Sequence, residues 1–152
     1  MDRQGVSPTT GKKSTMQGAR QYLLSFGVRP SVQRVAVMDY LMNHRTHPTA
    51  EEIYGALKER IASLLRMTVY NTLKMLSGVR AVREIDIDGH TMRYDGFTDF
   101  HAHFMCRNCG RIEDIAIADP APFSAVEATG TVDDMQFLLK GCCAKCAKKS
   151  AK

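Results

Sequence analysis

Residues 100–114 read FHAHFMCRNCGRIED, a stretch in which two kinds of metal ligand follow one another. His101 and His103 lie two positions apart, so in a strand both imidazoles point to the same face. Cys106 and Cys109 form a C-x-x-C pair, which can turn two thiolates toward one ion. Because imidazoles and thiolates favour different metals, the segment predicts two metal sites of different chemistry.

A second C-x-x-C pair stands close to the end of the chain. A single pair of this kind is also typical of thioredoxin-like redox proteins. Two pairs that bracket a small module favour structural zinc instead, because such a module has too little apolar core to be stable alone. Cys142 is left over. The predicted ligands of a tetrahedral Zn2+ site are Cys106, Cys109, Cys143 and Cys146.

The imidazole pair needs further ligands to hold an ion. Asp114 lies on the next predicted strand and can come alongside His101 and His103, while Asp95 and His47 are further candidates. Imidazole with carboxylate suits Mn2+, Fe2+ or Zn2+, and a site with open positions suits reactive iron. The H-x-H pattern alone is weak, because two surface histidines produce it as well. Ligands drawn from both halves of the chain would couple the first half to metal occupancy.

The charge of the 152-residue chain is unevenly distributed. Up to Asp95, 14 basic residues minus 9 acidic ones give +5, and the remainder has 7 minus 7. The whole excess lies in the first part, which favours nucleic acid as a partner there, with a solvated basic surface as the alternative. No apolar run is long enough for a signal peptide or a membrane span. We therefore expect a cytoplasmic protein with reduced cysteines and no membrane partner.

Four helices and a hairpin are predicted in the first part. The helices cover residues 19–26, a segment after a Ser31 cap, residues 49–61 with a capping box of Thr49 and Glu52, and residues 64–77. Two alternating segments, VREIDI (82–87) and TMRYD (91–95), then flank the turn residues 88–90. This order is typical of a winged helix-turn-helix, whose last helix enters the DNA major groove, and a generic helical bundle is the alternative.

The second part predicts a small α+β module. Its strands cover residues 101–106, 111–117 and 135–140, and a short helix runs from Asp119 to Gly130. The fold class of the whole chain is therefore α+β.

Four segments, HPTAEEIY (47–54), TVYNTLKML (68–76), RYDGFTDFHAHFMCRNCGRIEDI (93–115) and GCCAKC (141–146), together resemble the ferric uptake regulator family of bacterial metal-dependent repressors. The resemblance runs from about Gly18 to Cys146. It implies a homodimer with a winged-helix DNA-binding domain (16–95) and a small α/β dimerisation domain with structural zinc (96–152). The polar composition of residues 1–15 predicts a flexible tail before them. One departure is Arg80, where family members often have glycine. A regulator of this kind is not an enzyme.

The resemblance also implies a regulatory Fe2+ or Mn2+ at the hinge, held by His47, Asp95, His101, His103 and Asp114. Asp114 stands where iron-uptake regulators typically have glutamate, and Asn71 resembles the peroxide-responsive type. We therefore favour a repressor that hydrogen peroxide inactivates by iron-catalysed oxidation of His47 or His101. An iron-uptake or other metal-uptake repressor is the alternative.

The expected DNA partner is a double-stranded, A/T-rich palindromic operator. Asn71 can pair bidentately with adenine, and the Tyr70 ring can meet a thymine methyl group. Basic residues of the first part are candidates for phosphate contacts. The predicted DNA-binding residues are Arg20, Arg34, Arg66, Thr68, Tyr70, Asn71 and Lys74.

Two other classes of protein remain as alternatives. An iron oxygenase also uses two histidines and a carboxylate, but it keeps three protein ligands where this chain offers five, and it has no affinity for a palindromic duplex. A metal-storage or metal-carrier protein likewise binds metal without binding DNA. Specific binding to an operator separates both classes from a repressor.

Overall fold

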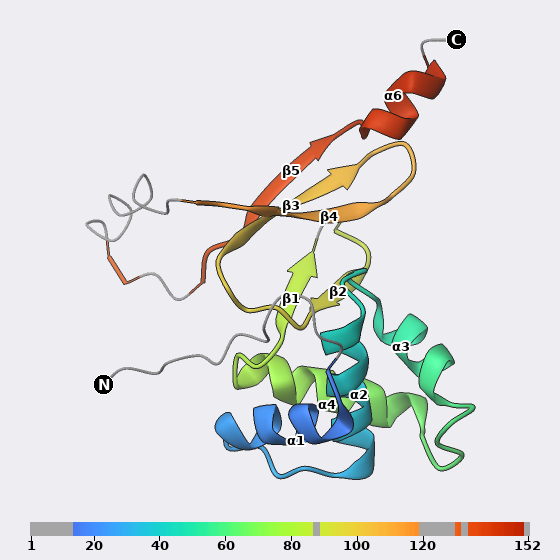
Figure 1. Ribbon diagram of the computed structural model, residues 1–152, viewed down its shortest axis with the longest axis vertical. Helices are drawn as coiled ribbons and strands as arrows, with labels where there is room; N and C mark the ends of the chain where they lie inside the picture. Colours follow the sequence, from blue (N-terminus) through green and yellow to red (C-terminus); the bar gives the residue numbers. More distant parts are fainter. Residues whose placement is uncertain (1–13, 87–88, 119–129, 132–133, 151–152) are drawn as a thin grey trace. The chain divides into compact units, whose positions relative to one another are not determined.

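A computed structural model describes residues 14–86, 89–118, 130–131 and 134–150. The chain divides into two compact units, one ending at Thr98 and one beginning at Asp99, whereas the sequence places the boundary after Asp95. The first unit contains four helices and a two-stranded sheet, and the second contains a three-stranded sheet and a helix among its described residues (Figure 1). This arrangement confirms the predicted α+β class. No helix in the described ranges has the length and apolarity needed to span a membrane.

The four helices of the first unit begin where the sequence supplies caps. Their bounds are α1 (Met16–Ser25), α2 (Val32–Asn43), α3 (Ala50–Leu57) and α4 (Arg66–Gly78). The Thr15 and Ser31 side chains accept hydrogen bonds from the opening turns of α1 and α2, and Thr49 forms the predicted capping box with Glu52. Helix α4 begins after Leu65 without a side-chain cap.

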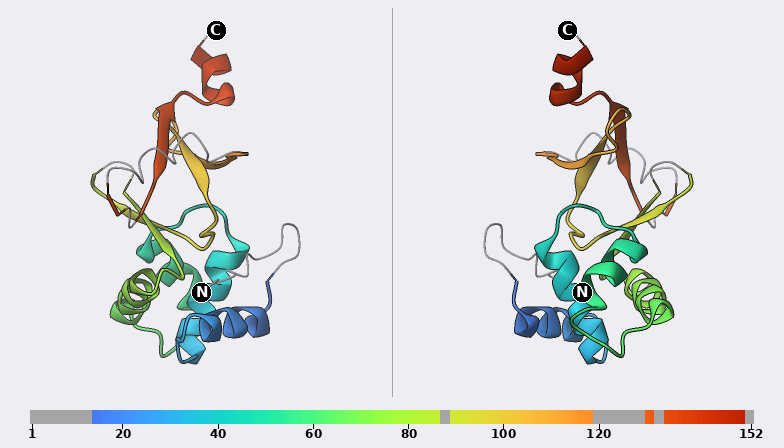
Figure 2. Two further views of the ribbon diagram at one scale, coloured as in Figure 1. Left: turned by 90° about the vertical axis from the view of Figure 1, so that its left-hand side faces the viewer. Right: turned by 90° about the vertical axis from the view of Figure 1, so that its right-hand side faces the viewer.

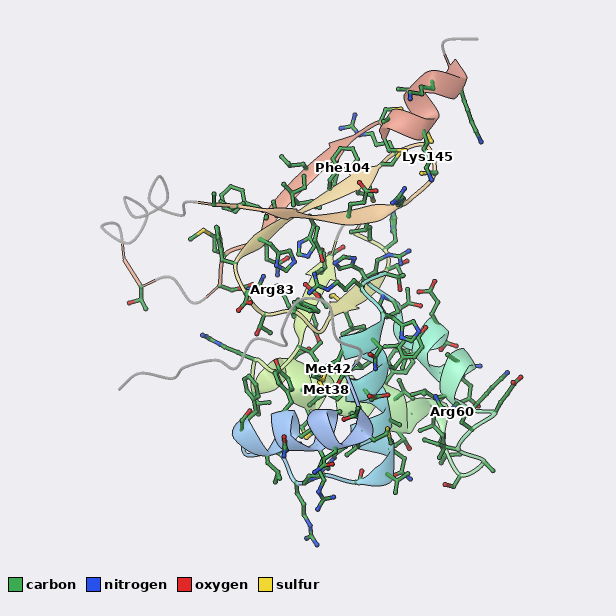
Figure 3. All side chains as sticks on the ribbon, viewed as in Figure 1. Met38, Met42, Arg60, Arg83, Phe104 and Lys145 are labelled. Carbon is green, nitrogen blue, oxygen red and sulfur yellow. The ribbon has the colours of Figure 1, made fainter. Side chains whose placement is uncertain are left out.

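The core of the first unit lies between these helices. Helix α1 packs against α2, and both α2 and α3 pack against α4. Met38 of α2 is fully buried among them (Figure 3). The predicted inward face of α4, made of Val69, Leu73 and Leu76, is also fully buried. Apolar residues at helical spacing therefore hold α4 by one side and leave its other side outward.

Helix α3 is shorter than predicted. It ends at Leu57, and a turn follows in which the carbonyl of Leu57 accepts from the amides of both Arg60 and Ile61 (each 3.0 Å). Ile61 lies outside the helix but still packs against the core as a half-buried side chain. The apolar periodicity continued past the point where the backbone left the helix.

The predicted hairpin follows α4. Strands β1 (Arg83–Asp86) and β2 (Met92–Asp95) pair antiparallel, with Ile85 opposite Arg93. Gly89 in the turn has a φ of 75°, a left-handed conformation that suits glycine, and its N–H donates to Asp86 Oδ1 at 2.7 Å. Residues 87–88, part of the predicted strand end and turn, lie outside the described residues.

The second unit is built on β3 (His101–Cys106), which lies between β4 (Ile112–Ala116) and β5 (Phe137–Gly141). Strand β3 pairs antiparallel with β4 and parallel with β5. Helix α6 (Ala144–Ser150), which was not predicted, follows directly after β5 in both views of Figure 2. Strand β5 begins two residues later than predicted, and the helix expected over 119–130 falls mainly on residues 119–129, which are outside the described residues.

Candidate metal centres

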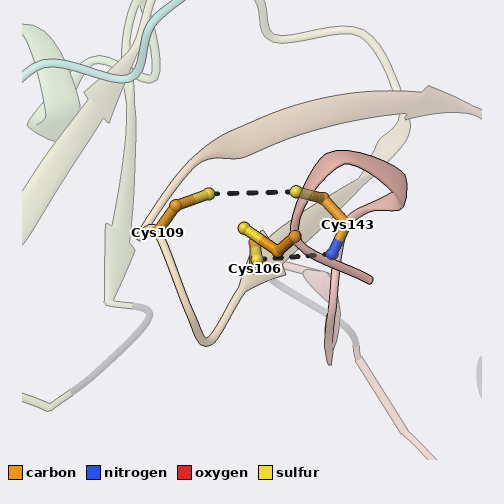
Figure 4. A group of neighbouring side chains, drawn as sticks. Cys106, Cys109 and Cys143 are labelled. Carbon is orange, nitrogen blue, oxygen red and sulfur yellow. Dashed lines mark hydrogen bonds between the residues drawn. The ribbon is translucent and has the colours of Figure 1, made fainter. Parts of the chain in front are cut away.

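The four predicted zinc ligands come together in the second unit. Cys106 ends β3, and Cys109 lies on the turn that follows. Cys143 directly precedes α6, and Cys146 lies within it. Their Sγ atoms all lie within 4.8 Å of one another. In Figure 4, Cys109 points toward Cys143 across this gap, with an Sγ–Sγ distance of 3.9 Å. A disulfide requires about 2.05 Å, whereas ligands of a tetrahedral zinc lie about 3.8 Å apart at a Zn–S distance of about 2.3 Å.

Backbone hydrogen bonds hold the two cysteine loops in place. Cys106 N–H donates to Arg111 O at 2.9 Å, and Gly110 N–H donates to Cys106 O at 2.9 Å. Gly110, directly after Cys109, has a φ of 70°, a left-handed conformation that suits glycine and ends the turn holding the first two cysteines. Arg107 N–H donates to Gly141 O at 2.8 Å and so ties this turn to the end of β5. The thiols are therefore brought together by the chain itself.

The thiols influence one another's ionisation. Hydrogen bonds from the backbone N–H groups of Cys143 and Cys109 lower the pKa of Cys106 to about 6, because they favour its thiolate. Hydrogen bonds with the Cys143 and Cys109 side chains raise the pKa of Cys146 to about 12. Cys106 therefore ionises more readily than Cys146, and a cation beside the two would favour the thiolate of both; this donor set fits Zn2+. Cys142 is exposed and lies outside the cluster.

The second unit also brings His101, His103 and Asp114 together. Strand pairing places His103 opposite Asp114, and the two histidine side chains lie on one face of β3. Their Nε2 atoms are 2.9 Å apart, and Asp114 Oδ1 lies 3.4 Å from that of His101 and 3.7 Å from that of His103. Neighbouring nitrogen ligands at about 2.1 Å from an octahedral ion lie about 3 Å apart. Two imidazoles and a carboxylate fit Fe2+ or Mn2+.

The surroundings of this group orient its imidazoles. His101 Nδ1 lies 2.7 Å from the carbonyl oxygen of Asp99, an interaction in which the ring N–H donates and directs Nε2 toward His103. His103 is 2% exposed, so its ring has little access to bulk water. Burial of polar groups is costly unless they have partners. The arrangement is therefore typical of a prepared binding group rather than of surface histidines.

The two remaining candidate ligands belong to the first unit. His47 lies in the loop before α3 and is 1% exposed, and Asp95 ends β2 and is 3% exposed. Asp95 Oδ1 accepts a hydrogen bond from Phe97 N–H at 2.8 Å. The carbonyl of His47 accepts from Arg93 Nη1 at 3.0 Å. The role of His47 and Asp95 as metal ligands stays a prediction from the resemblance.

The outward side of α4 carries most of the predicted DNA-binding residues. Tyr70, Asn71, Lys74 and Arg66 are exposed, and Thr68 is half-buried. Two of them meet a residue that the sequence did not single out: Glu51 Oε2 lies 2.5 Å from Arg66 Nη1, and Glu51 Oε1 accepts from the Tyr70 hydroxyl at 3.3 Å. Glu51 lies two positions after Thr49, the capping residue of α3, and no spacing marks it as a partner of α4.

A cleft of about 380 Å³ lies between α4 and the start of α2. Thr68 and Asn71 line it from α4, while Arg34 lines it from α2 and donates to the carbonyl of Arg29 at 2.9 Å. Arg20 is exposed on α1. The two arginines that line the cleft, Arg29 and Arg34, together with its amide and hydroxyl groups are suited to phosphate and base edges. Contact of the predicted residues with DNA stays a prediction.

Comparison with known proteins decides the family. Residues 25–122 match the ferric uptake regulator family. The chain belongs to that family. This ferric uptake regulator family member is 34% identical over 137 residues to the peroxide operon regulator of Bacillus subtilis (strain 168). The match covers 88% of this chain and 94% of that protein. The peroxide-responsive repressor PerR of Staphylococcus epidermidis is 39% identical over 88 residues, 58% of this chain and 59% of that one.

Solved structures of regulators share the fold of this family member. The Campylobacter jejuni peroxide stress regulator matches with a TM-score of 0.64 and 26% identity, over 88% of this chain and 99% of that chain. The ferric uptake regulator of Helicobacter pylori matches with a TM-score of 0.67 and 20% identity, over 91% and 97%. These findings confirm the resemblance to the family and to its peroxide-responsive members.

Proposed function

We propose that this chain is a metal-dependent transcriptional repressor that binds an A/T-rich palindromic operator as a homodimer and is inactivated by hydrogen peroxide. The observation that carries the proposal is the close group of His101, His103 and Asp114, whose side chains fit Fe2+ or Mn2+. Similarity to a peroxide operon regulator over 88% of the chain supports it. Membership of a regulator family supports a regulatory role over that of an oxygenase or a metal carrier.

The proposed regulatory site has five ligands. As the resemblance implies, His47 and Asp95 of the first unit would join His101, His103 and Asp114 of the second, and the burial of His47 and Asp95 supports a role away from bulk water. One ion bound by ligands of both units would restrict how the units move against each other, which is how metal occupancy would change affinity for DNA. Three imidazoles and two carboxylates leave one position of an octahedral ion open.

Peroxide sensing requires that the ligands themselves react. Bound Fe2+ would supply the electron that cleaves the O–O bond of peroxide, whereas bound Mn2+ would support DNA binding without this chemistry. In the net change, one imidazole C–H of His101 or His47 is oxidised and takes one oxygen from peroxide, and the other oxygen leaves as water. The contact between His101 Nδ1 and Asp99 O keeps the other edge of the ring directed toward His103 and Asp114. An oxidised imidazole is a poorer ligand, so the site weakens.

Zinc has a different proposed task. A closed four-thiolate site has no open position, so it would hold the small sheet and α6 together whether or not the signal is present. The lowered pKa of Cys106 and the raised pKa of Cys146 agree with this task, because a bound divalent cation would favour the Cys146 thiolate beside that of Cys106. Thiolates would therefore serve the permanent site, and imidazoles with carboxylates would serve the reactive one.

Helix α4 is the proposed reading element for DNA. Asn71 would pair with adenine, and the Tyr70 ring would contact a thymine methyl group. Lys74, Arg34 and Arg20 would bind phosphates, which makes the affinity fall steeply with salt concentration. Arg66 would exchange its contact with Glu51 for one with DNA.

Peptide mass spectrometry after brief, stoichiometric peroxide treatment tests the proposal. Zinc-containing protein loaded with Fe2+ should gain one oxygen on the peptide of His47 or His101 and lose operator binding, and the Mn2+-loaded protein should do neither. The exposed His44 and His90 serve as internal controls, because a reaction at the bound ion should leave their peptides unchanged. If no histidine is oxidised and operator binding follows only the metal concentration, the chain is a metal-uptake repressor instead.

A further inference from the structure

The backbone at His47 adopts a conformation that needs support from its surroundings. Its φ is 51°, in the left-handed region that residues with side chains rarely adopt, and its side chain is only 1% exposed. The next residue is Pro48, which has no N–H to donate. At Pro48 itself the backbone can be held only through its carbonyl group, and a conformation such as that of His47 persists only where neighbouring groups determine it.

Strand β2 provides that support at two successive carbonyls. Arg93 Nη1 donates to the carbonyl of His47 at 3.0 Å, and the backbone N–H of Tyr94 donates to the carbonyl of Pro48 at 3.0 Å. An isolated antiparallel bridge joins Thr49 to Arg93. The loop that carries His47 is thus attached to the hairpin strand along its length.

Arg93 is itself held from two sides. In the hairpin it pairs with Ile85 of β1, and its guanidinium lies 3.7 Å from Glu52 Oε2. The same Glu52 oxygen accepts from the Thr49 N–H at 2.7 Å in the capping box of α3. One half-buried guanidinium therefore connects the hairpin strand, the loop of His47 and the first turn of α3. Both contacts are made by the same nitrogen, Nη1, which carries two N–H groups and so can face the carbonyl and the carboxylate together.

We propose that Arg93 is a positioning residue for the His47 imidazole and that it joins this ligand to the hairpin. The inference rests on the proposed role of His47 as a metal ligand. Asp95, the other proposed ligand of this unit, ends the same strand two positions further on, so strand β2 carries one ligand directly and holds the other through Arg93. A shift of the hairpin on DNA would then move both ligands, and metal binding would in turn fix the hairpin.

The test compares Mn2+ affinities of full-length, zinc-containing variants by titration calorimetry. Arg93→Gln should bind Mn2+ about 10- to 100-fold more weakly than wild type, the usual effect of removing a group that orients a metal ligand. Arg93→Lys should lie between the two, and it replaces the Gln variant should that one fail to fold. The matched control is Arg83→Gln, which removes a guanidinium–carbonyl hydrogen bond to Thr98 (3.2 Å) from the same hairpin and should leave the affinity within about twofold of wild type.

A second readout separates positioning from general stability. In imidazole ¹⁵N spectra of the zinc-containing, manganese-free protein, Arg93→Gln should shift or broaden the His47 signals and leave those of His103 in place, while Arg83→Gln should change neither. Wild-type affinity in both Arg93 variants, together with loss of binding in His47→Ala, would overturn the inference and leave the proposed function standing. Mn2+ binding that is indifferent to His47→Ala would instead overturn the proposed ligand set, and the inference with it.

Discussion

Replacing Cys106 by serine should unfold the second unit and leave the first unit folded. Helices α1–α4 and the hairpin share a core in which Leu23, Met38, Ile53 and Leu73 are fully buried. Among the described residues of the second unit, the buried apolar side chains are Ala102, Cys106 and Ile112, and of these only Cys106 is fully buried. The first unit can therefore rely on apolar burial, whereas the second must rely on its metal.

The magnitude follows from the ligand geometry. Cys106 supplies one of four sulfur atoms within 4.8 Å of one another, and its Sγ also accepts the N–H of Cys143 at 3.3 Å. A structural zinc of this type contributes an apparent folding free energy of about 10–16 kcal/mol. The total stability of a typical domain is about 5–15 kcal/mol. Losing most of the zinc term should therefore leave β3, β4, β5 and α6 without net stability.

Hydrogen exchange read by mass spectrometry measures this effect in the full-length chain. In Cys106→Ser, peptides from β3 to β5 should exchange within seconds, and peptides from α1, α2 and α4 should keep their protection. Cys142→Ser is the matched control, because this neighbouring thiol lies outside the cluster and its loss should change neither zinc content nor protection. Protected β3–β5 amides in a zinc-free variant would refute the reasoning, as would simultaneous loss of protection in α1–α4.

Further variants probe single features of the first unit. Thr49→Ala removes the capping box of α3 and should lower the free energy of unfolding in urea by about 1 kcal/mol, with Thr49→Ser unchanged. Arg80 has a φ of 60°, so Arg80→Gly should be more stable than Arg80→Ala by about 1 kcal/mol, the reverse of the usual order. Burial disfavours the charged carboxylate of Asp39 and raises its pKa above the ordinary value of 3.8. The free energy of unfolding therefore falls as the pH rises through the raised pKa. Asp39→Asn should have a higher Tm than wild type at pH 7 and an equal Tm near pH 3. In operator titrations, Asn71→Ala should relax the preference at one base pair by about 1–3 kcal/mol, and Lys74→Ala should weaken binding to all sequences alike and reduce the salt dependence.

Much of the fold could be predicted because its signals are local. Ser31 and Thr49 cap helices where the sequence places caps, and apolar residues of α4 repeat with the helical period. Alternation likewise marks both strands of the hairpin. Helix α6 was missed, because its seven residues carry no apolar stripe and its start depends on cysteines that are brought together from two distant loops. The early end of α3 was missed because the apolar spacing continues to Ile61, beyond the turn at residues 58–60.

The sequence by itself determined which atoms could bind metal: four thiols in two pairs, and imidazoles with carboxylates around residues 101–114. These follow from residue type and from spacings of two or three positions, which local backbone geometry converts into shared faces and tight turns. Only the tertiary structure decided the pairing of His103 with Asp114, the parallel pairing of β3 with β5 that closes the thiol cluster, and the contact of Arg93 with His47. The physical reason is that strand register and contacts between distant segments depend on how whole elements pack, and no short stretch of residues encodes that information.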